Sequence, residues 1–576
     1  MDSIQKIEVG DWTVSPARNL LERDGQSVKL KPRAMDVLVY LADHAGEVVS
    51  TEELISAVWQ GRVVGDGTIY QSINQLRQAL GDGTRKTGYI ETIAKRGYRL
   101  VAVVRPAESP SPEARRKPIQ SLVVLPLTNL SSDTEQDYFA DGMTEVLIAN
   151  LAKIRALKII SRTSAMRYKG SNRSLPEIAA ELDVDAVVEG SVLRAGPKVR
   201  ITLQLIQAAT DIHIWGENYE RDVEDVLLLQ SEVAQAVTRE IEIAVTPEEE
   251  KNLASARRVN PLAYEAYLKG RFHYWKVTPQ DFEKALEYYN LALERDPDYA
   301  LAYTGICDVW GARGSFGIVA PREAFSIGKP AALKAVEMDN QLAEAHEMIA
   351  RYKMLYEWDG PAAERAARRA IALSPNNPDV GFAYWWFLLI TRRFADAIKH
   401  SEHVLSLDPF NLTFQCYLGW QLLYERRHDD AVAQFSKVLA VEPNFPWARL
   451  GLGSTFHRIG MYEQALAEAK QYLLLMGHHE GAEAMEHGHA DSGYQAGMLE
   501  AAKTLVAESK SRYVQAIHIA RLYMYAGEKD LALDWLESSY EFGDCWLAML
   551  HLDVDWDSVC EEPRFTKLLE KIGLDS

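Results

Sequence analysis

Hydrophobic spacing over residues 32–100 predicts three amphipathic helices followed by a short hairpin. Ile69, Ile73, Leu76 and Leu80 recur at i, i+4, i+7 and i+11, which places them on one stripe of a helix. The stripe should face a core, so the opposite side of this helix would point outward. The β-rich runs at 89–93 and 96–100 are then expected to form the two strands of the hairpin.

A change of composition separates this first block from a second one. Residues 106–118 contain four prolines and no large apolar side chain, which predicts an exposed, semi-stiff linker. Residues 119–245 alternate β-rich and helical segments. We expect strands at 122–125, 157–161, 186–193, 199–207 and 213–219, and helices at 139–154, 175–182 and 226–243. This pattern predicts an α/β domain with a mixed sheet.

The third block, residues 246–576, repeats itself. Three prolines and three small residues recur at intervals of 34 residues: Pro375, Pro409, Pro443, and Ala397, Ala431, Ala465. A period of 34 with helical filling is typical of tetratricopeptide repeats, whose helix pairs bury their apolar faces by stacking. The fold class is therefore multidomain, with a small helical and hairpin block (residues 1–105), an α/β mixed-sheet domain and an all-α solenoid.

Details of the repeats follow from local composition. The pairs Leu418-Gly419 and Leu452-Gly453 are 34 residues apart and are expected to begin helix pairs. Residues 311–330 and 478–493 interrupt the period and are rich in glycine, so both are expected to be loops. Residues 557–574 should close the array as a capping helix.

Composition limits the possible partners. The chain has 576 residues, 47% of them hydrophobic, and a net charge of -19, yet residues 85–105 hold six basic side chains against one acid, Glu91. Four scattered cysteines never form a CxxC motif, which favours reduced thiols. There is no secretory signal at Met1 and no apolar run of about 20 residues, so we expect a cytoplasmic protein without a membrane contact.

The outward side of residues 66–80 carries amide side chains. Gln and Asn can form paired hydrogen bonds with adenine in a major groove that admits a helix. The following basic hairpin could contact phosphates, which set the register of a protein on DNA, and the Thr68 hydroxyl, in a cap formed by residues 65–68, could meet another phosphate. The predicted DNA-binding residues are Thr68, Gln71, Asn74, Gln75, Arg77, Gln78, Thr92, Lys95, Arg96 and Arg99.

The first block resembles the OmpR/PhoB-type winged helix-turn-helix. The resemblance rests on residues 31–34 opening the first helix, the turn at 46–50, Val58-Trp59 ending the second helix, and Gly97-Tyr98 in the hairpin. That family carries Arg at the positions of Gln75 and Arg77; only Arg77 matches, so its operator sequence does not transfer. The alternative is a winged helix used for protein contacts or dimer packing.

The order of the blocks resembles CadC/HilA-like regulators without a membrane helix. Residues 121–240, with Val123-Val124-Leu125-Pro126-Leu127 and Val188-Glu189-Gly190-Ser191-Val192, resemble a TolB-like domain, which implies a sensing or assembly role and no catalytic residues. The resemblance implies double-stranded DNA as a partner and a homodimer on tandem half-sites. RNA polymerase and an unidentified protein or peptide on the repeats are further candidate partners.

Other clusters admit two interpretations each. Asp137, Asp141 and Glu145 could be a metal or acid/base site, but a solvated face at a helix start is favoured. The histidines at 478, 479, 487 and 489 could hold a metal, although a loop between repeats is favoured. The aromatic sets within 264–275 and 384–387 are expected to pack helices rather than to form ligand cages. The four histidines are His478, His479, His487 and His489.

Three functions remain in competition. A sequence-specific transcriptional regulator is favoured by the agreement between the helix and hairpin patterns, and the resemblance implies that it is an activator. The alternative is a scaffold that assembles proteins on its repeats and uses the first block for tethering. An enzyme is disfavoured because no P-loop, GxGxxG, HExxH or GxSxG motif is found, and no cofactor or metal is expected.

Overall fold

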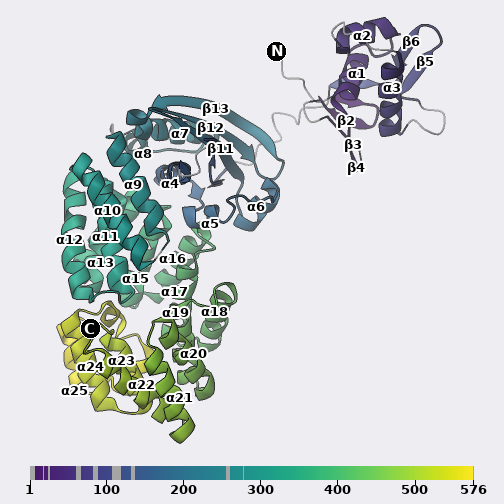
Figure 1. Ribbon diagram of the computed structural model, residues 1–576. Coiled ribbons are helices and arrows are strands. Elements are labelled where there is room, and N and C mark those ends of the chain that lie inside the picture. The colour runs from purple at the N-terminus through teal and green to yellow at the C-terminus, as the bar shows by residue number, and fades with distance from the viewer. Residues whose placement is uncertain are drawn as a thin grey trace. The chain divides into compact units, whose positions relative to one another are not determined.

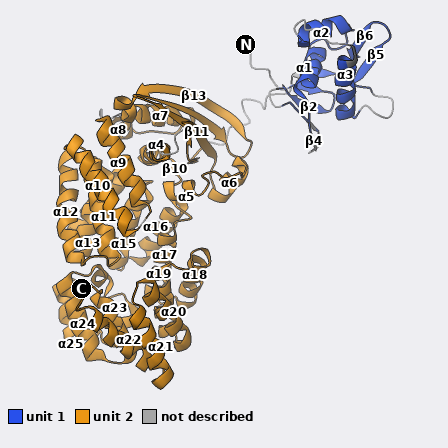
Figure 2. Cartoon of the chain, viewed as in Figure 1, with its two compact units in different colours: residues 1–117 blue, residues 118–576 orange. Residues whose placement is uncertain are grey.

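A computed structural model of the chain describes residues 7–16, 19–23, 26–59, 66–81, 88–106, 119–131, 136–254, 260–276 and 278–574. The chain divides into two compact units, residues 1–117 and residues 118–576 (Figure 1; Figure 2). Each unit has its own hydrophobic core.

The first unit combines an antiparallel sheet, three helices and a hairpin. The sheet has the strand order β4-β3-β2-β1-β7. Its strands are β1 (Ile7–Val9), β2 (Trp12–Ser15), β3 (Leu20–Arg23), β4 (Gln26–Lys29) and β7 (Val104–Pro106). The helices are α1 (Pro32–Asp43), α2 (Thr51–Trp59) and α3 (Asp66–Leu80), and the hairpin consists of β5 (Ile90–Ile93) and β6 (Gly97–Leu100). The three predicted helices and the hairpin are confirmed.

Local chemistry explains where these helices begin. Pro32 occupies the first position of α1, where its missing N–H costs no hydrogen bond. At the start of α2, the Ser50 N–H donates to Glu53 Oε2 (2.7 Å) and the Glu53 N–H donates to Ser50 Oγ (3.2 Å), a capping box. These hydrogen bonds lower the pKa of the Glu53 carboxyl. The predicted linker begins with Pro106, the last residue of β7, and its remaining residues lie outside the described part.

The second unit begins with a mixed α/β sheet, as expected. Its strand order is β10-β8-β11-β12-β13, with β9 beside β11. Strand β11 runs parallel to β8 and antiparallel to β12. The strands are β8 (Ser121–Val124), β9 (Thr128–Asn129), β10 (Lys158–Ile159), β11 (Ala186–Ala195), β12 (Lys198–Gln207) and β13 (Ile212–Asp222), and the predicted helices are α4 (Asp137–Leu151), α6 (Leu175–Leu182) and α7 (Val226–Glu240).

Three short helices and strands of this region were not predicted from the sequence. They are β9, α5 (Arg162–Met166) and α8 (Pro247–Ala254). Helix α5 has five residues and begins after Ser161, whose side chain accepts a hydrogen bond from the Ser164 N–H (3.2 Å). Segments this short do not develop a hydrophobic period, so a pattern search cannot detect them.

Paired helices follow from residue 261 onward. They are α9 (Pro261–Tyr274) with α10 (Pro279–Arg295), α11 (Ala300–Ser315) with α12 (Pro321–Met338), α13 (Ala343–Leu355) with α14 (Gly360–Leu373), α15 (Pro378–Ile390) with α16 (Phe394–Leu407), α17 (Leu412–Tyr424) with α18 (His428–Val441), α19 (Pro446–Arg458) with α20 (Tyr462–Leu475), α21 (His479–Ser492) with α22 (Tyr494–Glu508), and α23 (Ala516–Ala526) with α24 (Lys529–Phe542). Helices α15, α17 and α19 recur at the predicted interval, and Ala397, Ala431 and Ala465 are buried.

The prediction of two glycine-rich loops in the repeats was wrong. Residues 311–330 belong mostly to α11 and α12, and residues 478–493 belong mostly to α21. A Cβ at Gly328 would overlap Tyr352 Oη, and one at Gly488 would lie 2.7 Å from the Ala496 carbonyl oxygen. Glycine occurs at these positions because neighbouring helices approach closely, which a pattern of glycines alone does not distinguish from a loop.

The glycines of the Leu-Gly pairs have a different position from the one predicted. Gly419 and Gly453 lie in the middle of α17 and α19 and do not begin helix pairs. A Cβ at Gly419 would lie 2.6 Å from the Phe435 ring, so this glycine allows the two helices of a pair to pack closely. The expected closing helix is present as α25 (Pro563–Lys571), which buries Phe565 and Leu568.

The α/β part of the second unit is joined to the repeats at the proline-containing turns. The Asn376 side chain donates to the Ile154 carbonyl (2.7 Å), and the Ser164 hydroxyl donates to Asp408 Oδ1 (2.6 Å). The Ser161 N–H donates to the Leu407 carbonyl (2.8 Å). These hydrogen bonds connect segments that are far apart in the sequence, so the sheet and the repeats form one compact unit.

Two of the three carboxylates of α4, those of Asp141 and Glu145, do not belong to a solvated face. Asp141 is 7% exposed and pairs with Lys169 (2.6 Å), while Glu145 pairs with Arg271 of α9 (2.6 Å) and with Arg162 of α5 (3.1 Å). Asp137 accepts a hydrogen bond from Asn129. The expectation was wrong for Asp141 and Glu145 because their cations come from elsewhere in the sequence, whereas the Asp137 side chain is 46% exposed. Paired in this way, the carboxylates stabilise the junction of α4 with its neighbours.

The remaining clusters have structural surroundings. Within the described residues, no group of three or more His, Cys, Asp or Glu side chains could hold a metal ion. His478 contacts Glu508 (2.8 Å) and His489 contacts Glu463 (3.3 Å). Most members of the two aromatic sets are buried between helices, as expected; Phe272 is 36% exposed. The four cysteines are free. Among the described helices, none is long and apolar enough to cross a membrane.

Candidate DNA-binding interface

Helix α3 has one buried side and one polar side. Ile69, Ile73, Leu76 and Leu80 are 0% exposed, which confirms the stripe that seats the helix on the core. The predicted base-contacting side chains lie on the remaining surface: Gln71 and Gln78 are exposed, and Asn74 and Gln75 are half-buried. The amide groups therefore line a helix surface of the kind that enters a major groove.

The hairpin presents basic side chains at its turn. Residues 94–96 connect β5 and β6, and both Lys95 and Arg96 are exposed. Lys95 adopts the left-handed backbone conformation, with φ 60°. Gly97 follows with φ 131°, and a Cβ there would overlap the Val49 carbonyl oxygen. Glycine is thus required because β6 pairs closely with Val49, rather than by the hairpin turn itself.

Arg77 points toward the hairpin. Its guanidinium donates to the Ile90 carbonyl through Nη2 (2.9 Å) and Nε (3.3 Å), and Nη2 also donates to Thr92 Oγ1 (2.8 Å). Two predicted DNA contacts, Arg77 and Thr92, therefore bind each other. In this arrangement Arg77 holds the hairpin against α3.

Arg99 is paired across the hairpin. Its Nη2 lies 2.6 Å from Glu91 Oε2, and its Nε lies 3.2 Å from the same oxygen. Glu91 and Arg99 are opposite each other in the strand register. The pair is partly exposed, so the carboxylate offsets a charge that was predicted to face phosphate.

The N-terminal end of α3 differs from the expected cap. The helix begins at Asp66, so Thr68 is its third residue and lies inside the first turn, while Gly65 is outside the described residues. Thr68 is exposed, and its carbonyl accepts a hydrogen bond from the Ser72 hydroxyl (3.1 Å). A hydroxyl in the first turn still lies at the helix end that favours anions.

Two features of this surface were absent from the predicted set. Tyr70 is 58% exposed on α3 beside Gln71. Glu91 neutralises Arg99, a pairing that the register of a hairpin with its turn at 94–96 could have indicated. Trp12 supports the interface from behind, because its Nε1–H donates to the Leu80 carbonyl at the end of α3 (3.2 Å).

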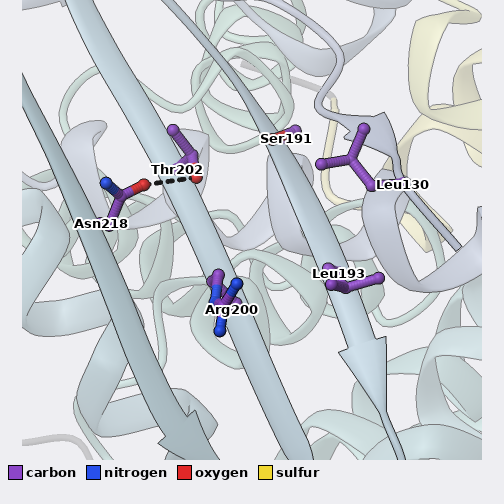
Figure 3. A pocket seen from close by; sticks show the side chains of 6 residues that line it. All are labelled: Leu130, Ser191, Leu193, Arg200, Thr202 and Asn218. Atoms are coloured by element: carbon purple, nitrogen blue, oxygen red, sulfur yellow. Dashed lines mark hydrogen bonds between the residues drawn. The ribbon is translucent and has the colours of Figure 1, made fainter.

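The second unit offers a hollow on the face of its sheet. It measures about 330 Å³ and is lined by Leu130, Ser191, Leu193, Arg200, Thr202 and Asn218 (Figure 3). Thr202 Oγ1 donates to Asn218 Oδ1 (2.6 Å), and Arg200 is paired with Glu220 (2.7 Å). Because these polar groups already satisfy one another, the hollow is a weaker candidate site than the α3 surface.

Comparison with known proteins finds a family match within the first unit. Residues 25–100 match the family described as "Transcriptional regulatory protein, C terminal". "Transcriptional activator CadC" of Escherichia coli (strain K12) is 42% identical over 99 residues, which cover 17% of this chain and 19% of CadC. Its solved DNA-binding domain is 40% identical and covers 18% of this chain and 98% of that domain, with a TM-score of 0.17.

Two other relatives extend further along the chain. "Transcriptional regulator HilA" of Salmonella typhimurium is 22% identical over 412 residues, which cover 71% of each protein. "Putative adenylate cyclase 3" of Rhizobium meliloti is 36% identical over 200 residues, which cover 35% of this chain. This chain aligns with only part of two of these relatives, with 34% of the cyclase-named protein and 19% of CadC. Residues 25–100 are thus a winged helix of the OmpR/PhoB type.

Proposed function

We propose that this chain is a sequence-specific, DNA-binding transcriptional regulator. In this proposal α3 enters the major groove, and Gln71, Asn74, Gln75 and Gln78 contact base edges. Lys95 and Arg96 contact the phosphate backbone beside that groove. The observation that carries the proposal is an amide-lined helix surface, opposite a fully buried stripe, next to an exposed basic hairpin turn.

The residues divide into two roles by their surroundings. Amides on α3 would select the sequence, because bidentate contacts to bases discriminate by about 1–3 kcal/mol each. Lys95 and Arg96, together with Thr68, would position the protein on any duplex. Arg77, Thr92 and Arg99 have intramolecular partners in this structure. The proposed contribution of Arg77 and Thr92 is to orient the hairpin, whereas Arg99 would contact DNA through the donors that Glu91 leaves.

The second unit would supply regulation. Residues 119–245 resemble a TolB-like domain, and the helix pairs behind them are suited to binding a protein partner. We propose an activator that binds tandem half-sites as a homodimer, with RNA polymerase as a candidate partner. The relative named as an adenylate cyclase matches over about a third of its length, and the proposal for this chain includes no enzymatic activity.

Binding measurements on the full-length chain test the proposal. Genome-wide mapping of bound sites in cells identifies fragments, and fluorescence anisotropy then compares them with scrambled duplexes of equal length. We expect a specific affinity at least about 1000-fold above the affinity for scrambled DNA. Equal affinity for every fragment would instead support the tethering scaffold.

Variants separate the two residue roles. Asn74→Ala should weaken binding to the mapped site far more than to scrambled DNA, because it removes a base contact. Arg96→Ala should weaken both equally and reduce the slope of log K against log salt by about 1. Gln341→Ala, an exposed amide in the second unit, is the matched control and should change neither. A base-specific loss from Arg96→Ala would contradict these assignments.

A further inference from the structure

A segment near the C-terminus packs against earlier repeats. The surface that it covers, formed by α15, α17, α19 and α23, is called the groove. We call residues 544–559 the return segment. It contains two short 3-10 turns, Cys545–Met549 and Val554–Trp556, between α24 and α25. Its apolar side chains are almost fully buried, with Leu547, Leu550 and Trp556 no more than 1% exposed. A segment without a long helix is therefore enclosed by the repeats in the manner of a bound peptide.

A tryptophan anchors this segment. The Trp546 ring lies 6.2 Å from that of Trp386, 5.8 Å from that of Trp420 and 5.4 Å from that of Trp447, measured between centroids. These three rings come from α15, α17 and α19, the first helices of three successive pairs. Consecutive repeats thus build one aromatic pocket that accepts an indole.

Arginines hold the backbone of the segment. Arg392 donates to the His551 carbonyl (2.8 Å) and Arg426 donates to the Leu552 carbonyl (3.3 Å). These two arginines are one repeat apart and both have positive φ, so each occupies the equivalent turn of its repeat. The array therefore presents arginine donors at the spacing of the repeat to an incoming backbone.

Carboxylates complete the recognition. Asp557 pairs with Arg426 (2.8 Å) and with Arg458 (2.6 Å) at the partly exposed rim. Deeper in the groove, Arg521 pairs with Asp553 (2.7 Å) and Asp555 (2.6 Å). The groove thus contacts a tryptophan and, further along the same segment, three acidic side chains at alternate positions.

We propose that this groove is the partner-binding surface of the repeats and that the return segment occupies it in cis. The partner is a protein segment with the same chemistry, a tryptophan followed by carboxylates at the spacing of Asp553, Asp555 and Asp557, which replaces residues 544–559. The proposal rests on the repeats being the partner-binding part of the proposed function. Because the cis segment is tethered, its effective concentration is high and keeps the groove closed to weak competitors.

The test uses the full-length chain and a fluorescent peptide of residues 544–559. Trp546→Ala in the chain weakens the resident segment but leaves the groove intact, so the peptide should bind this variant at least about 30-fold more tightly than the wild type. A peptide that carries the same Trp546→Ala change should lose that binding. Trp310→Ala, which removes a tryptophan of α11 outside the groove, is the matched chain variant and should behave like the wild type.

A second measurement covers the case in which Trp546→Ala does not fold. Asp557→Ala removes two ion pairs at the rim of the groove. The peptide should bind this variant more weakly than it binds Trp546→Ala but more tightly than it binds the wild type. In the wild-type chain, amides of residues 544–559 should exchange with solvent faster than those of α17. A folded Trp546→Ala chain that ignores the peptide, or equal exchange of the two segments, would overturn the proposal. DNA binding enters none of these assays, so failure here leaves the proposed DNA-binding function untouched.

Discussion

Replacing Arg77 by alanine tests whether this side chain orients the hairpin or contacts DNA directly. The guanidinium makes hydrogen bonds to the Ile90 carbonyl and to Thr92 Oγ1. A charged donor is worth about 1.5–3 kcal/mol per hydrogen bond when buried. Because Arg77 is half-exposed, we expect a loss of about 1 kcal/mol for each acceptor. Arg77→Ala should therefore lower the stability of the hairpin by about 2 kcal/mol in total.

That loss converts into DNA affinity through the hairpin. If the phosphate contacts of Lys95 and Arg96 require an ordered hairpin, a cost of about 2 kcal/mol weakens binding by up to about 30-fold, the limit reached when the variant hairpin is mostly disordered in the free protein. The loss should be the same for specific and scrambled duplexes. Hydrogen exchange should show faster exchange of amides in β5 and β6 of Arg77→Ala than in the wild type.

The control for Arg77→Ala removes the same charge elsewhere in the first unit. Arg105→Ala in β7 should reduce affinity only slightly and leave exchange of the hairpin unchanged. Arg77→Lys keeps the charge but lacks the forked donors, so it should resemble Arg77→Ala more than the wild type. Selective loss of discrimination at one base pair, with unchanged hairpin exchange, would refute the orienting role and restore Arg77 as a base contact.

Three further substitutions probe separate features. Gly97 has φ 131°, and a Cβ there would overlap a backbone carbonyl, so Gly97→Ala should lower the stability of the first unit by about 2 kcal/mol or more in thermal unfolding. Gly46 also has positive φ but open space around it, so the control Gly46→Ala should cost about 1 kcal/mol. Equal costs for the two substitutions would count against the close approach at Gly97. Glu91→Gln frees the Arg99 guanidinium and should strengthen binding to all duplexes about 2- to 5-fold at low salt, and weaker binding would mean that the pair positions Arg99. Burial lowers the pKa of His457 from 6.5 to about 4, so the unfolded chain gains this proton first as pH falls. His457 should therefore contribute about 2 kcal/mol to the loss of stability between pH 7 and pH 5, and His457→Phe should change the pH dependence measured in urea titrations by about that amount; an unchanged pH dependence would contradict the assignment.

Periodic features of this fold could be predicted from the sequence. The stripe of α3 and the regular spacing of helix pairs both follow from side chains that must be buried at fixed intervals, and α6 matches its expected bounds of 175–182. The limits of the other predicted strands and helices differ by a few residues because hydrogen bonding, not hydrophobicity, determines where an element ends.

Features that depend on a distant partner could not be predicted in this way. Gly488 resembles a loop residue in the sequence, but it lies in a helix because α22 approaches within a distance that excludes a Cβ. The carboxylates of Asp141 and Glu145 resemble a solvated face because Lys169 and Arg271 are not visible from α4 alone. In each case the deciding atom belongs to another element.

The candidate site shows the same division. Exposure of Gln71 and Gln78 follows from the helical period, since they lie away from the buried stripe. The direction of Arg77 does not, because a half-exposed arginine can face either solvent or a nearby acceptor. Arg77 faces the hairpin because its guanidinium donates to the Ile90 carbonyl, and the position of that carbonyl depends on how the hairpin packs beside α3.

The second unit uses the same repeats for two long-range contacts. Turns between pairs, at Asn376 and Asp408, hold the α/β part, and turns within pairs, at Arg392 and Arg426, hold the return segment. Helices α15 to α17 lie between these two sets of turns and are packed around rigid aromatic rings. Packed interiors transmit displacement because they cannot absorb it. A partner that replaces the return segment would therefore act on α15 to α17 first, and the α/β part would respond through the turns that hold it.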